Sequence, residues 1–405
     1  MDESKWSRLL LRIMSYVLVA VISVSATMAY CAIIFSDSSN IAQVLPTVQN
    51  NTDKLDELRK LIEERFIGET DRVALDDAAA TAMVSATGDR WSYYIPASQY
   101  AANQENMENS YVGIGITITQ RKDGTGLDVN QVEPAGGAKE AGILPGDIVT
   151  AVEGQKIADL GMDGVRNLIR GEEGTSVSIT ILRNGQTREV SVIRRRIQVV
   201  VASGKMLEDN IGLIKIVNFN DRCAQETIAQ IERLREEGAQ SLIFDVRFNP
   251  GGYKDELVQL LDYLLPEGEV FRSIYYNGRE QVDQSDANCL DMPFAVLINA
   301  DSYSAAEFFA AALDEYDRAI LVGEATVGKS YFQNTIKLSD GSAVALSVGK
   351  YVTPKGVTLA EVGGLKPEIE VKVDEKIAAQ IYGELLEDGQ DPQLQAAIRA
   401  LKKVK

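Results

Sequence analysis

The chain has 405 residues and a formal net charge of −18, and 45% of its residues are hydrophobic. This length is enough for two or three domains. The acidic balance argues against nucleic acid as a partner, because phosphate binding needs clustered Lys and Arg. The sequence contains no histidine, which excludes Ser-His-Asp catalysis and the common zinc sites. A hydrolytic serine would therefore need another base, and lysine is the other nitrogen base that proteins use.

The three cysteines do not suggest a metal centre. Cys31 falls in an apolar segment, and Cys223 and Cys289 are far apart in the sequence, with no Cys-x-x-Cys pair anywhere. We therefore expect no metal site and no cofactor. A disulfide between Cys223 and Cys289 and a pair of free thiols both remain open.

The N-terminus predicts a membrane anchor. Residues 13–35 form a 23-residue segment without charge, which as a helix would be ~35 Å long and could span a bilayer core of ~30 Å. Basic residues precede the segment, so the positive-inside rule places residues 1–12 in the cytoplasm and the rest of the chain outside. A cleaved signal peptide is the alternative, but its apolar core is usually only ~7–15 residues long. We expect an uncleaved single-pass anchor.

The next region, residues 36–109, combines a polar linker with helices. Apolar residues recur at helical spacing from about residue 53 to residue 66 and predict an amphipathic helix. A second helix is expected over residues 74–87. The apolar stripe of the first helix fits either core packing or a dimer interface.

Residues 110–197 read as one compact, β-rich module. A predicted strand is opened by Gly113 and Gly115, and Asn184-Gly185 is a strong signal for a two-residue hairpin. Closely spaced glycines let backbone N–H groups converge on an anion such as a chain-terminal carboxylate. On their own, the glycines would equally suit a simple β-bulge.

The whole module resembles a PDZ domain of bacterial proteases. Its Val-Gly-Ile-Gly stretch stands at the carboxylate-binding loop, and Pro145-Gly146-Asp147 matches the PDZ pattern. The resemblance implies capture of protein C-termini, with the bound tail added as an extra strand. The residues expected to bind the tail are Val112, Gly113, Ile114, Gly115 and Ile116, together with Val165, Leu168 and Ile169 on a short helix.

Residues 198–374 alternate strands and helices, which is typical of an α/β domain. An apolar strand over residues 294–299 leads to a helix, so Ser304 lies on a strand-to-helix turn. The Ala305 N–H and the helix dipole would then point at an oxyanion forming above Ser304. Ser304-Ala-Ala-Glu307 is also a capping box, a common feature of helix starts. The motif alone favours the cap.

Residues 323–330, Gly-Glu-Ala-Thr-Val-Gly-Lys-Ser, fit the P-loop pattern of nucleotide hydrolases. A P-loop must open a helix so that its N–H groups cradle phosphates. After Ser330, however, the sequence predicts a β-hairpin around Asp340-Gly341. We therefore expect Lys329 to act as a base, and we keep a P-loop-like nucleotide hydrolase as the alternative.

Several motifs in one order resemble the C-terminal processing peptidases, or tail-specific proteases, which are Ser-Lys serine endopeptidases. Residues 303–307 stand at the nucleophile motif, Gly328-Lys329 with Gln333 at the Lys and Gln positions, and residues 245–252 at the Asp-Leu-Arg-x-Asn-Pro-Gly-Gly signature. The chain departs from the family pattern at Tyr303, where a small residue is usual. An inactive PDZ adaptor is a further alternative, against which the intact Ser304, Lys329 and Gln333 argue.

The resemblance implies an α/β crotonase/protease-like core with an inserted PDZ domain, preceded by one transmembrane helix and a helical N-terminal segment. It also implies a homodimer in a bacterial cell membrane, with the catalytic domain outside, that acts on protein substrates with apolar C-terminal tails. The expected domains are 1–12 cytoplasmic tail, 13–35 anchor, 36–109 linker and helices, 110–197 PDZ domain, 198–374 protease domain and 375–405 helical tail. The expected site comprises the catalytic residues Ser304, Lys329 and Gln333, with Gly251, Gly252 and Ala305 as the oxyanion hole.

This chemistry sets a condition on Lys329. To accept the Ser304 proton, the amine must be neutral, so its pKa must fall from ~10.4 towards ~7–8 by loss of water. Gln333 could orient the amine without adding charge, whereas a carboxylate would raise the pKa.

Overall fold

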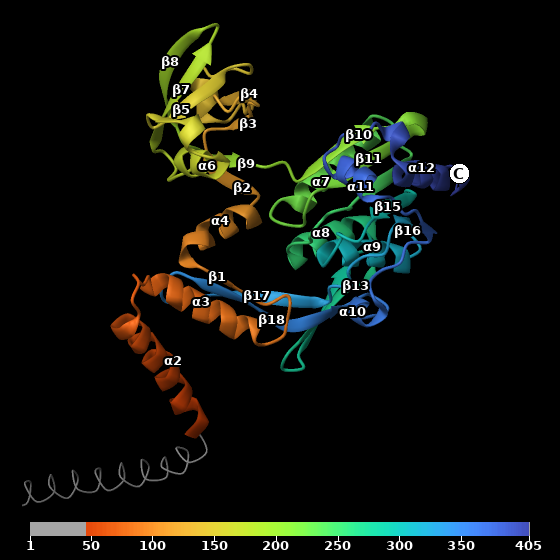
Figure 1. Cartoon of the computed structure of the whole chain (residues 1–405). Helices are drawn as coiled ribbons and strands as arrows, with labels where there is room; N and C mark the ends of the chain where they lie inside the picture. Colours follow the sequence, from red (N-terminus) through yellow and green to blue (C-terminus); the bar gives the residue numbers. More distant parts are fainter. Residues whose placement is uncertain (1–45, 405) are drawn as a thin grey trace, which may run out of the picture. The chain divides into compact units, whose positions relative to one another are not determined.

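The structure is a computed structural model that describes residues 46–404 (Figure 1). The chain divides into two units, residues 1–80 and 81–405. The first unit contains α2 (Pro46–Arg65) and the beginning of α3 (Arg72–Ser85). An ion pair of 2.8 Å between Arg59 and Asp76 joins the two helices. The second helix lies close to its predicted bounds, whereas the first begins at residue 46 rather than at about residue 53.

The predicted transmembrane anchor, residues 13–35, lies outside the described residues. Along residues 46–404, none of the helices combines the length and the apolar character needed to cross a bilayer. The single-pass anchor and the membrane location therefore find no support in the structure, and we correct the fold prediction to a mixed α/β protease fold with a PDZ domain. The anchor was inferred only from the uncharged segment of residues 13–35, and none of the described helices is comparably long and apolar.

The PDZ module is built around an antiparallel sheet of strand order β3-β4-β5-β7-β8, with β6 paired to β5. Asn184 and Gly185 join β7 and β8 with φ angles of 52° and 76°, which confirms the predicted hairpin. Strand β3 lies at the edge of the sheet, and β2 pairs separately with β9. The elements of this region are α4 (Ala97–Met107), β2 (Ser110–Gly113), β3 (Ile116–Gln120), β4 (Leu127–Val132), α5 (Gly137–Glu140), β5 (Ile148–Val152), β6 (Gln155–Lys156), η1 (Ile157–Asp159), α6 (Met162–Ile169), β7 (Ser176–Arg183), β8 (Gln186–Ile193) and β9 (Arg195–Gln198).

A second sheet has six strands in the order β10-β11-β12-β15-β16-β19, parallel except for the β10–β11 pair. The central strands β12 and β15 are buried along their whole length, as expected for a sheet covered on both faces. The elements are β10 (Ala202–Met206), η2 (Glu208–Asn210), β11 (Ile211–Ile216), α7 (Cys223–Glu236), β12 (Ser241–Asp245), α8 (Lys254–Leu264), β15 (Phe294–Ile298), α9 (Ala305–Glu315), β16 (Ala319–Gly323) and β19 (Ile369–Glu370).

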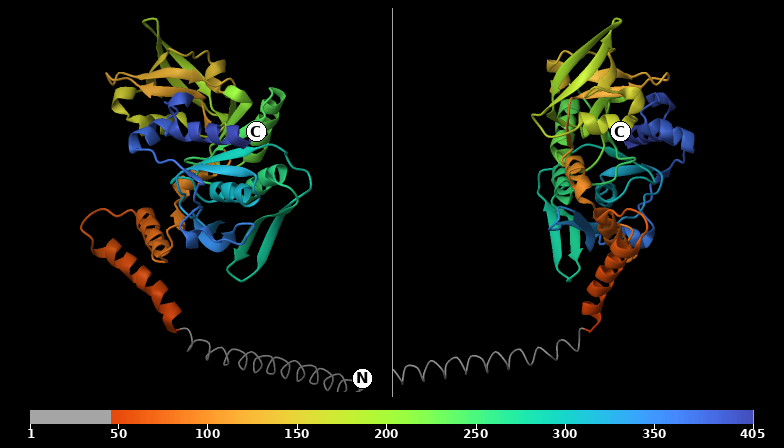
Figure 2. Two further views of the ribbon diagram at one scale, coloured as in Figure 1. Left: turned by 90° about the vertical axis from the view of Figure 1, so that its right-hand side faces the viewer. Right: turned by 60° about the vertical axis from the view of Figure 1, so that its left-hand side comes forward.

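Alternate residues of this sheet enter two separate cores. One face packs against α7, α8 and α9, with Phe244 and Val296 among the contacts. The opposite face, which includes Ile243 and Leu297, packs against the C-terminal helix α12 (Pro392–Val404), drawn in blue in Figure 2. The period-2 alternation of strand side chains explains how one apolar strand serves both layers.

A further sheet follows the order β1-β18-β13-β14, with β17 paired to β18. Its strands are β1 (Tyr93–Ile95), β13 (Gly268–Tyr275), β14 (Glu280–Ser285), β17 (Tyr331–Lys337) and β18 (Ala343–Val352). Strands β17 and β18 form the predicted hairpin around Asp340-Gly341. The segment after Lys329 is therefore a strand, and the helix that a P-loop requires is not there.

The C-terminal region, expected to be a helical tail over residues 375–405, is divided into separate helices. After α10 (Leu359–Val362) and β19, the chain forms α11 (Glu375–Tyr382), η3 (Asp388–Gln390) and α12. Asp391 accepts hydrogen bonds of 3.0 Å from the backbone N–H groups of Gln393 and Leu394. This capping, with Pro392 at the first helical position, starts a new helix. Cys223 and Cys289 are both free thiols.

Candidate active site

Ser304 lies on a strained turn at the start of α9. Its backbone has φ 60° and ψ −126°, a conformation that non-glycine residues rarely adopt. The loop before it is fixed, because Ser302 Oγ donates to the Val246 carbonyl at 2.8 Å and the Tyr303 N–H donates to the Asn249 carbonyl at 3.1 Å. Strain held by its surroundings is typical of functional positions.

The glycine loop after Asn249 approaches the Ser304 turn closely. A methyl group at Gly251 would lie 2.7 Å from Ser304 Cβ and 2.8 Å from the Ala305 nitrogen, and one at Gly252 would lie 2.2 Å from the backbone of Phe219. Only glycine fits this approach at either position. The Gly251 N–H already donates to Asn249 Oδ1 at 2.8 Å.

Glu307 connects the two halves of the candidate site. Its buried carboxylate accepts hydrogen bonds from the backbone N–H groups of Ser304 (2.9 Å), Gly328 (2.6 Å) and Lys329 (2.8 Å), and from the Thr326 hydroxyl. Burial raises the pKa of Glu307, and these hydrogen bonds oppose the rise. One side chain thereby holds the Ser304 turn and the Lys329 loop in a fixed relation.

Two aromatic rings lie near the Lys329 amine. Lys329 Nζ is 4.7 Å from the centroid of the Trp91 ring and 5.9 Å from that of Tyr303. Burial lowers the pKa of Lys329 from its ordinary value, while the negative charges of Glu307 and Asp89 oppose the fall. The direction is the one that a lysine base requires.

Gln333 lies on β17 and faces a different set of partners. Its Nε2 donates to the Tyr331 carbonyl at 3.1 Å and to Ser347 Oγ at 2.9 Å. The Ser347 N–H donates to Ser92 Oγ, which in turn donates to Asp89 at 2.6 Å. Within residues 46–404, no hydrogen bond joins the Lys329 amine to the Ser304 hydroxyl or to Gln333. The structure therefore places Gln333 in a polar chain that ends at Asp89.

Three residues near Ser304 and Lys329 were not anticipated from the sequence as parts of the candidate site. Glu307 was interpreted only as a helix cap, and neither Asp89 nor Trp91 was expected to lie near the lysine. Trp91 comes from the segment before the PDZ module, more than 200 positions from Lys329. The Ser-x-x-Glu spacing was the one available signal for Glu307, and nothing in the local pattern indicated Trp91.

The expected peptide-binding residues of the PDZ module divide into two groups. Ile114, Val165 and Ile169 are buried in the core of the module, while Ile116 and Leu168 pack only partly against it. A methyl group at Gly115, which has φ 76°, would lie 2.8 Å from the Gly136 Cα. The loop thus needs a glycine there. Because β3 is the edge strand, its free side can accept a further strand.

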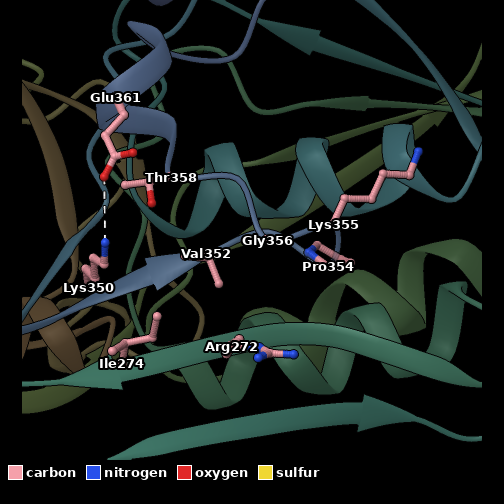
Figure 3. Close-up of a pocket in the computed structure, with 9 residues that line it drawn as sticks. All are labelled: Arg272, Ile274, Lys350, Val352, Pro354, Lys355, Gly356, Thr358 and Glu361. Carbon is pink, nitrogen blue, oxygen red and sulfur yellow. Dashed lines mark ion pairs between the residues drawn. The ribbon is translucent and has the colours of Figure 1, made fainter. Parts of the chain in front are cut away.

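A hollow of about 490 Å³ lies on β13 and β18 and the loop that follows β18. Figure 3 shows Lys350 facing Glu361 in an ion pair of 3.6 Å at its edge. The Arg272 guanidinium, also in its lining, is paired with Glu269 at 2.7 Å and with a second glutamate. None of the predicted site residues lines this hollow, so we do not assign the chemistry to it.

Comparison with known proteins identifies both domains of the chain. The profile of peptidase family S41 matches residues 210–371, and that of the PDZ domain matches residues 112–193. The chain is 31% identical over 330 residues to the carboxy-terminal processing protease CtpA of Bacillus subtilis (strain 168), covering 81% of this chain and 70% of the relative. The chain belongs to peptidase family S41. The resemblance stated from the motifs is thereby confirmed.

This S41 protease is a serine-type peptidase with a PDZ domain. A solved structure, that of a photosystem II D1 C-terminal processing protease, aligns with it at 25% identity. The alignment covers 78% of this chain and 86% of that chain, with a TM-score of 0.46.

Proposed function

We propose that the protein is an endopeptidase that captures protein C-terminal tails with its PDZ domain and cleaves peptide bonds with a Ser304–Lys329 dyad. The observation that carries this proposal is the Glu307 carboxylate, which accepts hydrogen bonds from the backbone of both dyad residues. A buried acceptor shared by a strained serine and a desolvated lysine fits a pair built to act together.

In the proposed reaction, Ser304 Oγ attacks the scissile carbonyl carbon and its proton passes to the neutral Lys329 amine. The tetrahedral intermediate collapses when the Lys329 ammonium protonates the leaving amine. The neutral Lys329 amine then activates a water molecule, which hydrolyses the acyl-enzyme. The Lys329 amine must move from its position beside Trp91 to reach Ser304. Such catalytic contacts are often long in proteins without a bound substrate.

We assign the oxyanion hole to the N–H groups of Ala305 and Gly252. Ala305 is the first residue of α9, where a backbone N–H has no acceptor within the helix. The Gly251 N–H is occupied by Asn249, so we give Gly251 the role of permitting the close approach of the loop to Ser304. Gln333 is proposed to act from a distance, through the polar chain to Asp89.

For substrate capture, we propose that a protein tail pairs with β3 and places its terminal carboxylate at residues 112–115. Support comes from the edge position of β3 and from the glycine backbone at Gly115. Leu168 and Ile116, which are only partly buried, are the side chains that we expect to contact the last apolar residue of the tail.

We also propose that the protein forms a homodimer through α2. Leu55, Leu58 and Leu61 of this helix are 38%, 52% and 40% exposed, and an apolar stripe of this kind favours a partner surface. Light scattering on the wild type and on Leu58→Glu tests the assignment. We expect a dimer for the first and a monomer for the second, and a wild-type monomer would contradict it.

The central proposal is tested by incubating the full chain with unfolded, reduced casein ending in an added apolar tail. We expect fragments with the wild type and none with Ser304→Ala, and we expect ATP to have no effect. Binding of the tail without cleavage would favour the inactive adaptor instead.

A further inference from the structure

A groove of about 470 Å³ opens beside the Ser304 turn. Its lining is mostly apolar and consists of three aromatic rings, one proline and two alanines, namely Phe248, Tyr303, Tyr382, Pro250, Ala378 and Ala379. A single carboxylate, that of Asp301, completes the lining, and this residue is exposed. The groove is separate from the PDZ module, which contributes no residue to it.

The groove shares its backbone with the proposed catalytic residues. Tyr303 directly precedes Ser304, and Pro250 directly precedes Gly251, whose position against Ser304 admits no side chain. The hydrogen bond of 3.1 Å from the Tyr303 N–H to the Asn249 carbonyl fixes these two walls to each other. The groove therefore lies within reach of the residues of a polypeptide whose scissile carbonyl lies at Ser304.

Tyr303 borders both the groove and the lysine. Its ring centroid is 5.9 Å from the Trp91 centroid and 5.9 Å from Lys329 Nζ. On the other wall, the rings of Phe248 and Tyr382 meet edge to face at 5.3 Å. The aromatic residue at position 303 thus supplies a wall that the small residue usual in this family would not supply.

Helix α11 leaves the groove open. None of its residues is buried, and it presents to the groove the methyl groups of Ala378 and Ala379 and the ring of Tyr382. Tyr382 is 69% exposed, which leaves much of an aromatic ring available for contact. Apolar area of this kind gains free energy when an apolar group covers it.

From these observations we propose that the groove binds one large apolar side chain, aromatic or branched aliphatic, of the substrate within two residues of the scissile bond. The inference rests on the proposed function and adds a sequence preference at the bond to the capture of the tail by the PDZ domain. Rings and methyl groups favour apolar side chains, and the Asp301 carboxylate disfavours acidic ones.

The test compares the wild type with Ala379→Trp and Gln380→Trp. Ala379 is exposed, so tryptophan there should fill the groove without disturbing a core. Gln380 is its neighbour on α11 and does not line the groove, which makes it a matched control for the added bulk. Melting temperatures of the three proteins check that each remains folded.

Cleavage sites in denatured casein, identified by mass spectrometry, locate the position of the preference. We expect enrichment of Phe, Tyr, Leu, Ile or Val at one fixed position near the bond. Two peptides with Phe or Ala at that position then give a ratio of kcat/KM. We expect this Phe-to-Ala ratio to fall roughly ten- to a hundredfold in Ala379→Trp and to remain at the wild-type value in Gln380→Trp.

The possible outcomes distinguish a failure of the groove assignment from a failure of the proposed function. Cleavage that depends on Ser304 but shows no apolar preference, or an unchanged ratio in Ala379→Trp, would overturn the groove assignment alone. Absence of any cleavage that depends on Ser304 would overturn the proposed function and this inference with it.

Discussion

Replacing Glu307 by alanine removes the acceptor that joins the Ser304 turn to the Lys329 loop. Three backbone N–H groups, those of Ser304, Gly328 and Lys329, lose their partner in a buried place. A buried donor without a partner costs ~1–3 kcal/mol, and the losses are not fully additive. We expect a fall of about 3–5 kcal/mol in the free energy of unfolding, or roughly 6–20 °C in Tm for a domain of this size.

The same change should affect catalysis beyond its effect on folding. A displacement of ~1 Å between reacting groups can cost ~10²-fold in rate. Glu307 is the side chain that holds the Ser304 turn in position relative to the Lys329 loop. At a temperature where the variant is folded, we expect kcat for a tailed peptide to fall at least ~10²-fold. Circular dichroism and steady-state cleavage provide the two measurements.

Glu315 offers a matched control on the same helix. Its carboxylate also joins a hydroxyl and a backbone N–H, those of Thr353 and Lys355, both at 2.6 Å. Glu315→Ala should lose stability but keep wild-type kcat in its folded fraction. The positioning role of Glu307 would be refuted if Glu307→Ala and Glu315→Ala lowered kcat to the same extent, or if neither variant lowered kcat.

Three more predictions concern the base, the glycine loop and the tail. Because burial lowers the pKa of Lys329, and because the neutral amine is the active form, the labelling rate of Ser304 by a fluorophosphonate should rise with pH and level off below the ordinary lysine range. Trp91→Ala, which admits water, should move that rise to higher pH, and a shift to lower pH would count against the burial argument. Gly251→Ala places a methyl group 2.7 Å from Ser304 Cβ, so cleavage should fall by at least ~10²-fold, and wild-type kinetics would show that the loop does not contact the working site. Amidating the tail of a peptide should weaken its binding to Ser304→Ala protein by roughly ten- to a hundredfold, as measured by fluorescence anisotropy, and equal binding of the free acid and the amide would exclude carboxylate capture.

The sequence predicted those features that depend on local chemistry. Asn184-Gly185 specifies a hairpin because both residues tolerate positive φ. The hairpin predicted after Lys329 distinguishes the loop that carries this lysine from a P-loop, which a helix must follow. The position of Ser304 before α9 followed from an apolar strand and a capping residue. Several motifs in one order supplied the family, which no single one of them could have done.

Other features depend on contacts between distant segments and could not be predicted in this way. Trp91 packs near Lys329 only because the chain folds back after the PDZ module, and no periodicity encodes that contact. The hydrogen bonds of Glu307 to the lysine loop cross 21 and 22 positions of sequence. The sequence indicated a helical tail without locating a break in it, whereas capping by Asp391 starts a separate helix there.

A double-mutant comparison shows whether Ser304 and Lys329 act as one unit. Tail-dependent cleavage is measured for Ser304→Ala, Lys329→Ala and the protein carrying both changes, with Tm confirming that all three fold. We expect that each single change abolishes cleavage and that the double variant is no worse than either. Substantial cleavage by Lys329→Ala would contradict it, because the proton of Ser304 would then pass to another base.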